Sequence, residues 1–186
     1  MTVGGKAVLK DSILEGNKIS GATVVGTGST AMARACVLEG NGTNVLVDVG
    51  GAVDLTGCSI KDARVYGMTI CGAGSKATAT DCQFNDSGFM NISATTGGEV
   101  NLLDCTLRGT RKGWSVLVSD AVVCARGCSF LDNSAGRADV SVKDGGRLAA
   151  EGCKFSRKPD VRSRGVTELF TCFFADDAGA GPAPVN

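Results

Sequence analysis

Cysteine is the residue type whose chemistry and spacing stand out in this chain. The 186-residue sequence contains nine cysteines and no histidine. Cysteines form disulfides, bind zinc as thiolates or act as nucleophiles. The odd number of cysteines, the absence of histidine and the absence of any Cys-x-x-Cys pair argue against zinc, so we expect no metal and no cofactor. Six of the nine recur every 22 to 25 residues, at Cys36, Cys58, Cys82, Cys105, Cys128 and Cys153.

This regular spacing favours a structural role for the six thiols. Reduced cysteine packs in protein interiors as a small apolar side chain. We therefore predict an inward-facing ladder of reduced thiols, with disulfides as the alternative. Reduced thiols are typical of a reducing, intracellular compartment. The first residues, Met-Thr-Val-Gly-Gly-Lys, show no basic segment followed by an apolar stretch, so no signal peptide is expected.

Cys124 lies outside the ladder and is expected in an outward-facing column. Arg126 follows two residues later, and a neighbouring cation favours the reactive thiolate. Cys124 is therefore the cysteine for which reactivity is predicted first. The alternative is a partly covered, inert thiol.

The residues around each ladder cysteine repeat with it. Each copy begins with two small residues, continues with alternating apolar and polar residues, and ends with the cysteine and a large apolar residue two positions later. The segment from Gly145-Gly146 to Cys153 and Phe155 is the clearest copy, and the first copy has Ser12 in the cysteine position. Alternation with a period of two is typical of a strand with one buried face. A repeat of this length corresponds to one coil of a solenoid.

These patterns predict an all-β, single-domain, right-handed parallel β-helix of about seven coils, with three short strands in each coil. One strand follows the small pair, a second precedes it, and the third carries the cysteine and the large apolar residue. We assign residues 1–164 to the coils, 165–175 to a terminal partial coil or cap, and 176–186 to a flexible tail.

Counting back from each small pair predicts which side chains of the preceding strand face inward. The positions two and four before the pair, which include Val24, Ile70 and Val118, are expected outside. The positions three before the pair are expected inside, namely Val25, Val47, Cys71, Ala94, Leu117 and Val142.

The sequences Asp-Cys-Gln-Phe (81–84), Gly-Cys-Ser-Phe (127–130) and Gly-Cys-Lys-Phe (152–155), each after an alternating strand, resemble the right-handed parallel β-helix repeats of the pectate-lyase-like superfamily. The resemblance covers residues 4–175 and is closest to short forms without enzymatic activity. In the enzymes of that superfamily, aspartates cluster on one exposed strand face, with calcium and a basic residue in the lyases. Carboxylates in the outward columns of this chain are isolated, so no residue is assigned as catalytic and an absence of enzymatic activity is favoured.

Basic residues gather near two of the predicted corners, beside Trp114. A basic patch with an exposed tryptophan suits an acidic polysaccharide or an acidic protein surface. The alternative is a solvated loop face that keeps the protein soluble. A net charge of zero argues against nucleic acid as a partner, and the lack of a long apolar run argues against a membrane span. The patch comprises Arg108, Arg111, Lys112 and Trp114 at one corner and Arg157, Lys158, Arg162 and Arg164 at the same corner two coils later.

Four large apolar residues close to the C-terminus, Leu169, Phe170, Phe173 and Phe174, are predicted to contact a cap or another chain. Two functional hypotheses follow. The first is a non-catalytic β-helix that serves as a structural or interaction module, such as a scaffold or virion component, with a protein partner or a second copy of itself. The alternative is a carbohydrate-binding or carbohydrate-active β-helix that acts on an acidic glycan.

Overall fold

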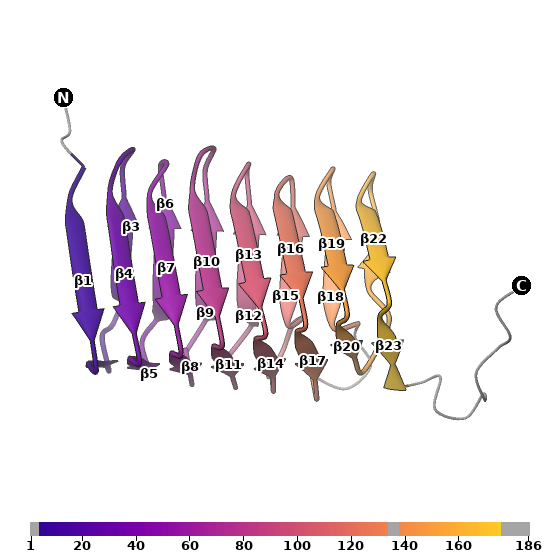
Figure 1. The fold of residues 1–186 in the computed structure, drawn as a ribbon, viewed down its shortest axis with the longest axis horizontal. Helices are drawn as coiled ribbons and strands as arrows, with labels where there is room; N and C mark the ends of the chain where they lie inside the picture. The colour runs from indigo at the N-terminus through magenta and orange to yellow at the C-terminus, as the bar shows by residue number, and fades with distance from the viewer. Residues whose placement is uncertain (1–3, 134–137, 176–186) are drawn as a thin grey trace, which may run out of the picture.

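Each repeat of the sequence forms one turn of a solenoid in the computed structural model, which describes residues 4–133 and 138–175. The turns stack side by side along one axis, and the first and last described coils lie at opposite ends of the rod (Figure 1). Within the described residues, strands pair in parallel and join equivalent positions of neighbouring coils, as Ala77 does with Val53 and Val100. The predicted right-handed parallel β-helix is confirmed.

The strand after each small pair belongs to sheet A. In the third of these strands Val53 and Leu55 are buried, whereas Asp54 and Thr56 are exposed, as the alternation predicts. The strands of sheet A are β1 (Lys6–Lys10), β4 (Thr30–Arg34), β7 (Ala52–Thr56), β10 (Lys76–Thr80), β13 (Glu99–Leu103), β16 (Val122–Arg126), β19 (Arg147–Glu151) and β22 (Val166–Phe170).

Sheet B carries the large apolar residue that follows each cysteine. The strands are short because the chain bends again after two or three residues. They are β2 (Ile13–Glu15), β5 (Val37–Glu39), β8 (Ser59–Lys61), β11 (Gln83–Asn85), β14 (Thr106–Arg108), β17 (Ser129–Leu131), β20 (Lys154–Phe155) and β23 (Phe173–Phe174).

Sheet C closes the triangular cross-section. Its strands precede the small pairs, and they are β3 (Ser20–Val25), β6 (Thr43–Asp48), β9 (Tyr66–Cys71), β12 (Met90–Thr95), β15 (Val116–Ser119), β18 (Val140–Lys143) and β21 (Asp160–Val161). No helix in the described part of the chain has the length and apolar character that a membrane crossing requires.

The ladder cysteines lie one position before the strands of sheet B, not inside those strands as predicted. The residue before each cysteine has a positive φ, as at Asp104 (52°) and Gly127 (62°), and this bend turns the cysteine inward. Glycine and aspartate tolerate this left-handed conformation better than other residues, which explains the recurring Gly-Cys and Asp-Cys pairs. All six ladder cysteines are buried.

Large side chains from sheet B fill the interior beside the thiols. The rings of Phe130 and Phe155 are stacked with centroids 4.7 Å apart, and Phe174 continues the stack at 5.5 Å from Phe155. Phe84 and Leu107 occupy the same column and are fully buried. The core is therefore a set of columns that run along the axis through all the coils.

The prediction of which sheet C residues face inward was wrong in three coils. Val25 is exposed and Cys71 and Leu117 are half-buried, whereas the preceding or following residues Val24, Ile70 and Val118 lie in the core. The corner between sheets C and A has four residues after β3 and β9, two after β15, and three after β6, β12 and β18. Because this corner varies in length, counting back from the small pair places some residues on the wrong face.

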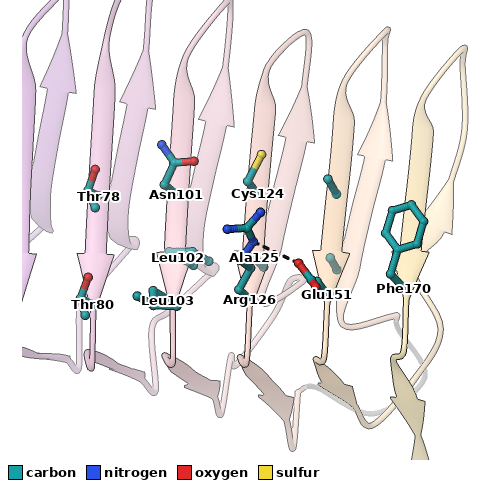
Figure 2. Close-up of a pocket in the computed structure, with 12 residues that line it drawn as sticks. Thr78, Thr80, Asn101, Leu102, Leu103, Cys124, Ala125, Arg126, Glu151 and Phe170 are labelled. Carbon is teal, nitrogen blue, oxygen red and sulfur yellow. Dashed lines mark ion pairs between the residues drawn. The ribbon is translucent and has the colours of Figure 1, made fainter.

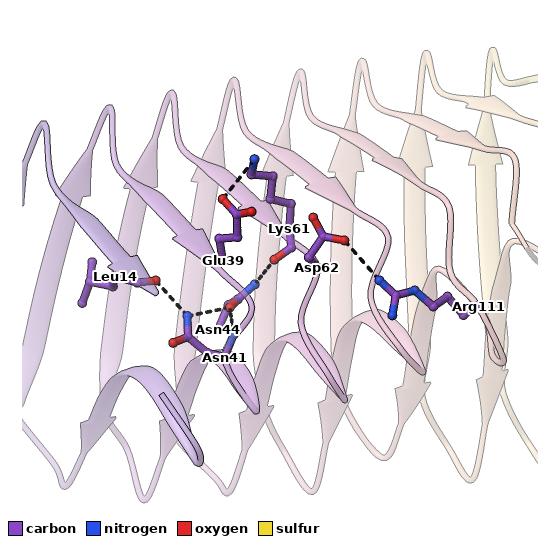
Figure 3. A network of polar contacts seen from close by, with 7 residues as sticks. All are labelled: Leu14, Glu39, Asn41, Asn44, Lys61, Asp62 and Arg111. Atoms are coloured by element: carbon purple, nitrogen blue, oxygen red, sulfur yellow. Dashed lines mark hydrogen bonds and ion pairs between the residues drawn. The ribbon is translucent and has the colours of Figure 1, made fainter. Parts of the chain in front are cut away.

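A buried polar column lines the corner between sheets B and C. Nδ2 of Asn44 donates to the carbonyl of Lys61, and Nδ2 of Asn91 donates to the carbonyl of Arg108, each at 2.9 Å. Figure 3 shows the first of these contacts, next to Asn41, which donates to the carbonyl of Leu14. The carbonyl of Lys61 also accepts the backbone N–H of Gly40, and that of Arg108 accepts the N–H of Asp86. The asparagine amides therefore add a second hydrogen bond to each carbonyl and fix the turn from inside.

Residues 166–174 keep the register of the coils. Strand β22 pairs with β19 and places Leu169 on Ala150, and β23 pairs with β20 and places Phe174 on Phe155. The segment predicted as a partial coil or cap thus supplies the last strands of sheets A and B. The predicted tail, 176–186, lies outside the described residues.

Candidate functional site

The structure divides the predicted basic patch between two corners. Arg108, Arg111 and Lys112 lie at the corner between sheets B and C, as do Arg157 and Lys158. Arg162 and Arg164 lie beyond β21, at the corner between sheets C and A. The sequence prediction of one shared corner is corrected here, because the short strand β21 separates the two groups.

Carboxylates neutralise part of this patch. Arg111 bonds Asp62 at 3.1 Å, from two coils away (Figure 3). Arg108 lies 3.5 Å from Asp132. Arg162 pairs with Asp160 at 2.9 Å. These pairs are exposed, so each contributes little to stability, but each reduces the net positive field that an acidic ligand would meet.

The aromatic residues of the patch are less open than predicted. Trp114 is half-buried. Lys112 lies over the ring of Phe89, with its ammonium 6.0 Å from the ring centroid, and Lys158 lies over Phe174 at 5.4 Å. Both distances fit cation–π contacts at an exposed site. The lysines of the patch are thus engaged with aromatic rings of the same chain.

A shallow groove of about 460 Å³ runs along the outer face of sheet A, across β10, β13, β16, β19 and β22 (Figure 2). Asn101, Cys124 and Ala149 contribute small side chains from the central outward column. The next column contributes Leu103, Arg126, Glu151 and Phe170. Arg126 and Glu151 bond each other at 3.1 Å, so the groove has little net charge.

Cys124 lies in this groove and is half-buried. The outward position is the one predicted from the sequence. Its partial cover is the feature expected of the inert alternative rather than of a reactive thiol. Cys71 and Cys172 are also half-buried.

The ladder thiols are held in protonated form through most of the rod. The hydrogen bond between the thiols of Cys82 and Cys105 raises the pKa of Cys82 to about 11, and the bond to Cys128 raises the pKa of Cys105 to about 12. Burial adds to both shifts. The pKa of Cys153 is lowered, because the thiol of Cys128 bonds to it. The raised pKa values disfavour the reactive thiolate at Cys82 and Cys105, and burial keeps the thiol of Cys153 away from solvent.

The described residues contain no cluster of metal-binding side chains, and one acidic side chain is buried. No three histidine, cysteine, aspartate or glutamate side chains among them are grouped so as to hold a metal ion. Asp139 is buried at the polar corner and accepts bonds from Nδ2 of Asn133 at 2.8 Å and from the backbone N–H of Arg157 at 2.7 Å. Burial raises the pKa of its carboxyl, and these bonds oppose part of the rise.

The terminal coils differ from the middle coils on the outer face of sheet B. At the C-terminal end Phe173 is 66% exposed, and at the N-terminal end Ile13 is 68% exposed. Between them the same outward column carries the partly exposed Val37 beside Ile13, and then Ser59, Gln83, Thr106, Ser129 and Lys154.

Sheet A also has exposed apolar side chains at both ends of the rod. Val8 is exposed on β1, and Phe170 is 59% exposed on β22. Leu169, also predicted as a contact residue, is partly exposed at the end of an inward column, and Phe174 is partly buried against the core. The predicted C-terminal group is therefore brought together on one coil, with Phe170 and Phe173 as its outward members.

The N-terminal apolar residues were missed by sequence reasoning. Val8, Ile13 and Ile19 are separated by polar residues and form no cluster in the linear sequence. The signal appears only when the outward columns of the repeats are aligned and each terminal residue is compared with its counterparts in the middle coils.

Comparison with known proteins identifies no family. No family model matches the chain, and no curated protein matches it. Among solved structures it is similar to tailspike protein 2 of the Escherichia coli O157:H7 bacteriophage CAB120, with 11% identity and a TM-score of 0.47, over 81% of this chain and 31% of the tailspike. This chain thus spans about a third of the tailspike.

A second similar structure is a trypsin-treated variant of the plasmid-mediated fluoroquinolone resistance protein QnrB1. The identity is 12% and the TM-score 0.36, over 98% of this chain and 100% of the other. Because both TM-scores are below 0.5, these likenesses carry nothing about function. The β-helix fold of this chain is established by its own strand register.

Proposed function

We propose that this protein is a non-catalytic β-helix that acts as an interaction module, and that its terminal coils are the surfaces that bind protein, a second copy first of all. The observation that carries the proposal is the outer column of sheet B, which is apolar at Ile13 and Val37, polar at each position from Ser59 to Lys154, and apolar again at Phe173. A rod whose sheet B is polar on its outer face in the middle coils and apolar at both ends suits a scaffold or a particle component in a reducing compartment.

The backbone supports the same conclusion. Strands β1 and β22 stand at the two ends of sheet A, and β2 and β23 at the two ends of sheet B. A strand at the end of a sheet has one row of N–H and C=O groups without strand partners, which favours pairing with another chain. The terminal coils thus combine unpaired strand edges with exposed apolar side chains.

Association of two copies is favourable only if several apolar side chains are buried in the contact at the same time. Moving a large apolar side chain from water into a contact contributes about 1.5–3 kcal/mol. Association costs roughly 4–15 kcal/mol in lost freedom of motion. Burial of one exposed phenylalanine does not offset the cost of association. Burial of Phe170 and Phe173, together with the end of the core, supplies a free energy of the required size.

Sedimentation velocity over a concentration series tests this proposal. We expect the average mass of the wild-type protein to rise above 18.8 kDa with concentration. The substitution Phe173→Asp should keep the protein monomeric, because a carboxylate replaces the apolar contact. The control Gln83→Asp changes the same column in a middle coil and should behave as the wild type. A wild-type protein that stays monomeric at every concentration would contradict self-association.

A second candidate function is the binding of a glycan in the groove on sheet A. The specific observation is the combination of an exposed ring, Phe170, with hydroxyl and amide groups from Thr78 and Asn101 in one elongated groove. Rings pack against sugar C–H faces, and amides bond sugar hydroxyls. Because Arg126 is paired with Glu151, a neutral oligosaccharide fits the groove better than the acidic glycan expected from the sequence.

Calorimetric titration with neutral and uronic-acid oligosaccharides tests the second candidate. Saturable binding that is lost in Asn101→Ala and retained in Gln83→Asp supports it. If a heat of binding is observed only with the uronic-acid oligosaccharides and is lost in Arg111→Ala, the ligand binds at the basic corner instead.

A further inference from the structure

The outer strands of the first and last coils carry side chains that can pack against each other at several equivalent positions. We propose that copies of the protein stack head to tail in continuous register, so that β22 and β23 of one copy pair in parallel with β1 and β2 of the next. This inference rests on the proposed function, since it specifies the partner and the geometry of self-association through the terminal coils.

The register follows from the pairing inside the chain. Equivalent residues of neighbouring coils pair throughout sheets A and B, as Ala150 does with Leu169 and Phe155 with Phe174. One further step in the same register places Leu9 of the next copy on Leu169. It also places Ser12 on Cys172 and Leu14 on Phe174. The two inward columns that contain Leu169 and Phe174 then continue with apolar side chains from one copy into the next, whereas Thr167 and Ser12 place hydroxyls in the other two columns at the joint.

The stack of rings has an open continuation at this end. Phe174 packs on Phe155, and Lys158 of the same chain lies over it. A lysine side chain is flexible enough to move from the ring as Leu14 of the next copy approaches. In the stacked rod, Phe174 would gain an apolar contact in place of Lys158, so that it would have apolar neighbours on both sides as Phe155 has.

The outer faces match as well. The same register places the exposed Phe173 beside the exposed Ile13, so the two outward apolar ends of sheet B cover each other. On sheet A, Phe170 comes to lie beside Lys10, a pairing suited to a cation–π contact. In the single rod the strand neighbours of Phe170 and Phe173 are the charged residues Glu151 and Lys154.

Charge complementarity supports the same arrangement. Glu168 lies in the outward column of Val8, and Lys6 and Lys10 flank Val8 on β1. Diagonal neighbours on adjacent strands are within reach of long side chains. In the stack, the carboxylate of Glu168 faces two lysines of the next copy. An inverted joint between two C-terminal coils would bring Glu168 near its own counterpart instead.

Sheet C does not take part in this joint. Strand β21 belongs to the coil before β22, and β3 belongs to the same coil as β1, so one strand position separates them in the stacked rod. Two of the three sheets are therefore continuous between the copies. The geometry is heterologous, and it leads to open filaments rather than closed dimers.

Paired blocking variants test the head-to-tail arrangement. One variant carries Val8→Asp and Ile13→Asp, which block the N-terminal coil. The other carries Phe170→Asp and Phe173→Asp, which block the C-terminal coil. All four side chains are exposed, so we expect both variants to fold with unchanged melting temperatures. Circular dichroism checks this before the mixing experiment.

Each variant alone should be monomeric, because each has only one functional end. An equimolar mixture should form a heterodimer of about twice 18.8 kDa and no larger species, since the two remaining ends are blocked. The wild-type protein should form a series of larger species. The double change Asn101→Asp and Gln83→Asp is the matched control, because it introduces the same charges in middle coils, and it should assemble as the wild type does.

The other outcomes overturn the arrangement in different ways. Dimers of the N-terminally blocked variant alone would show a tail-to-tail joint, and dimers of the C-terminally blocked variant alone would show a head-to-head joint. Both results reject the stack but retain self-association. Association of wild type only after removal of residues 176–186 would identify that segment as the cover of the last coil and reject the stack. A wild-type protein that stays monomeric with and without that segment rejects the proposed function itself.

Discussion

The middle coils and the terminal coils use the same inward residues but different outward ones. Phe130 in a middle coil and Phe174 in the last coil stand in one inward column, and both are apolar. In the outward column of sheet B, by contrast, Gln83 gives way to Phe173 at one end and Ile13 at the other. Packing inside the coil determines the residue type at inward positions. At outward positions the residue type depends on whether the side chain faces solvent or another surface. The contrast therefore separates the residues that build the fold from those that the proposed self-association would cover.

The largest expected difference between the two regions concerns the ring stack. Phe130→Ala should lower the free energy of unfolding by about 3–5 kcal/mol, because a fully buried ring leaves a cavity that neighbouring coils cannot fill. Phe174→Ala should cost less than half as much, since the ring is partly exposed. Urea denaturation followed by circular dichroism measures both. Equal losses would indicate that the last coil is covered in solution even without a partner.

The thiol ladder should show the same contrast on a smaller scale. Ser12 occupies the ladder position of the first coil, and its Oγ donates to the carbonyl of Lys10 at 2.8 Å, as the thiol of Cys105 does to Leu103 at 3.3 Å. Cys105→Ser keeps this bond but places a hydroxyl in an apolar column. We expect a loss of about 1 kcal/mol, at the lower end of the range for buried hydroxyls.

Cys172→Ser is the matched change at the open end, where the thiol is half-buried. It should leave the free energy of unfolding unchanged within error in the same urea experiment. A loss as large as that of Cys105→Ser would contradict the distinction between the regions.

A charge reversal at the proposed joint tests the contribution of the terminal coils to self-association. Glu168→Lys should weaken self-association up to about fivefold, because cross-strand ion pairs contribute roughly 0.2–1 kcal/mol. Adding Lys6→Glu and Lys10→Glu to the same chain should restore it. Sedimentation at low and high salt measures both, and the effect should shrink at high salt. Failure of the triple change to restore association would contradict the register.

The smallest expected effect is a pH dependence at the polar corner. Asn91 and Ser115 keep this column neutral in the middle coils, whereas Asp139 introduces a carboxyl near the C-terminal end. The raised pKa of Asp139 means that the folded protein holds its proton more tightly than the unfolded chain. Its contribution to stability is therefore fully present below the unfolded pKa of 3.8 and is lost as pH rises through the folded value.

Urea titrations from pH 3 to pH 7 measure this dependence in the wild type and in Asp139→Asn. The substituted protein should lack the component that falls with rising pH. An identical pH profile in both proteins would assign the raised pKa no role in stability.

The sequence was sufficient to predict the coils because alternation and cysteine spacing are local and repeated. Val53 and Leu55 face inward, as the alternation of apolar and polar residues along this strand predicts. The register of sheet C was not predictable at Val25, Cys71 and Leu117, because it depends on corner lengths that vary from coil to coil.

The candidate site was predictable only in part. The aromatic group at the C-terminal end was visible because Phe173 and Phe174 are adjacent in sequence. The pairing of Arg111 with Asp62 was not visible, since the coil pitch and not the sequence brings together residues 49 positions apart. The groove on sheet A was also missed, because its lining residues are scattered over five strands.

The corner between sheets C and A has one more consequence. The strands on either side of it stay aligned although its length changes from two to four residues. That bend can therefore take up extra residues without disturbing the neighbouring turns. A short epitope inserted between Asp120 and Ala121 would be displayed outward at a fixed height on the rod, and epitopes at successive bends would form a row with a spacing of about 4.8 Å per turn.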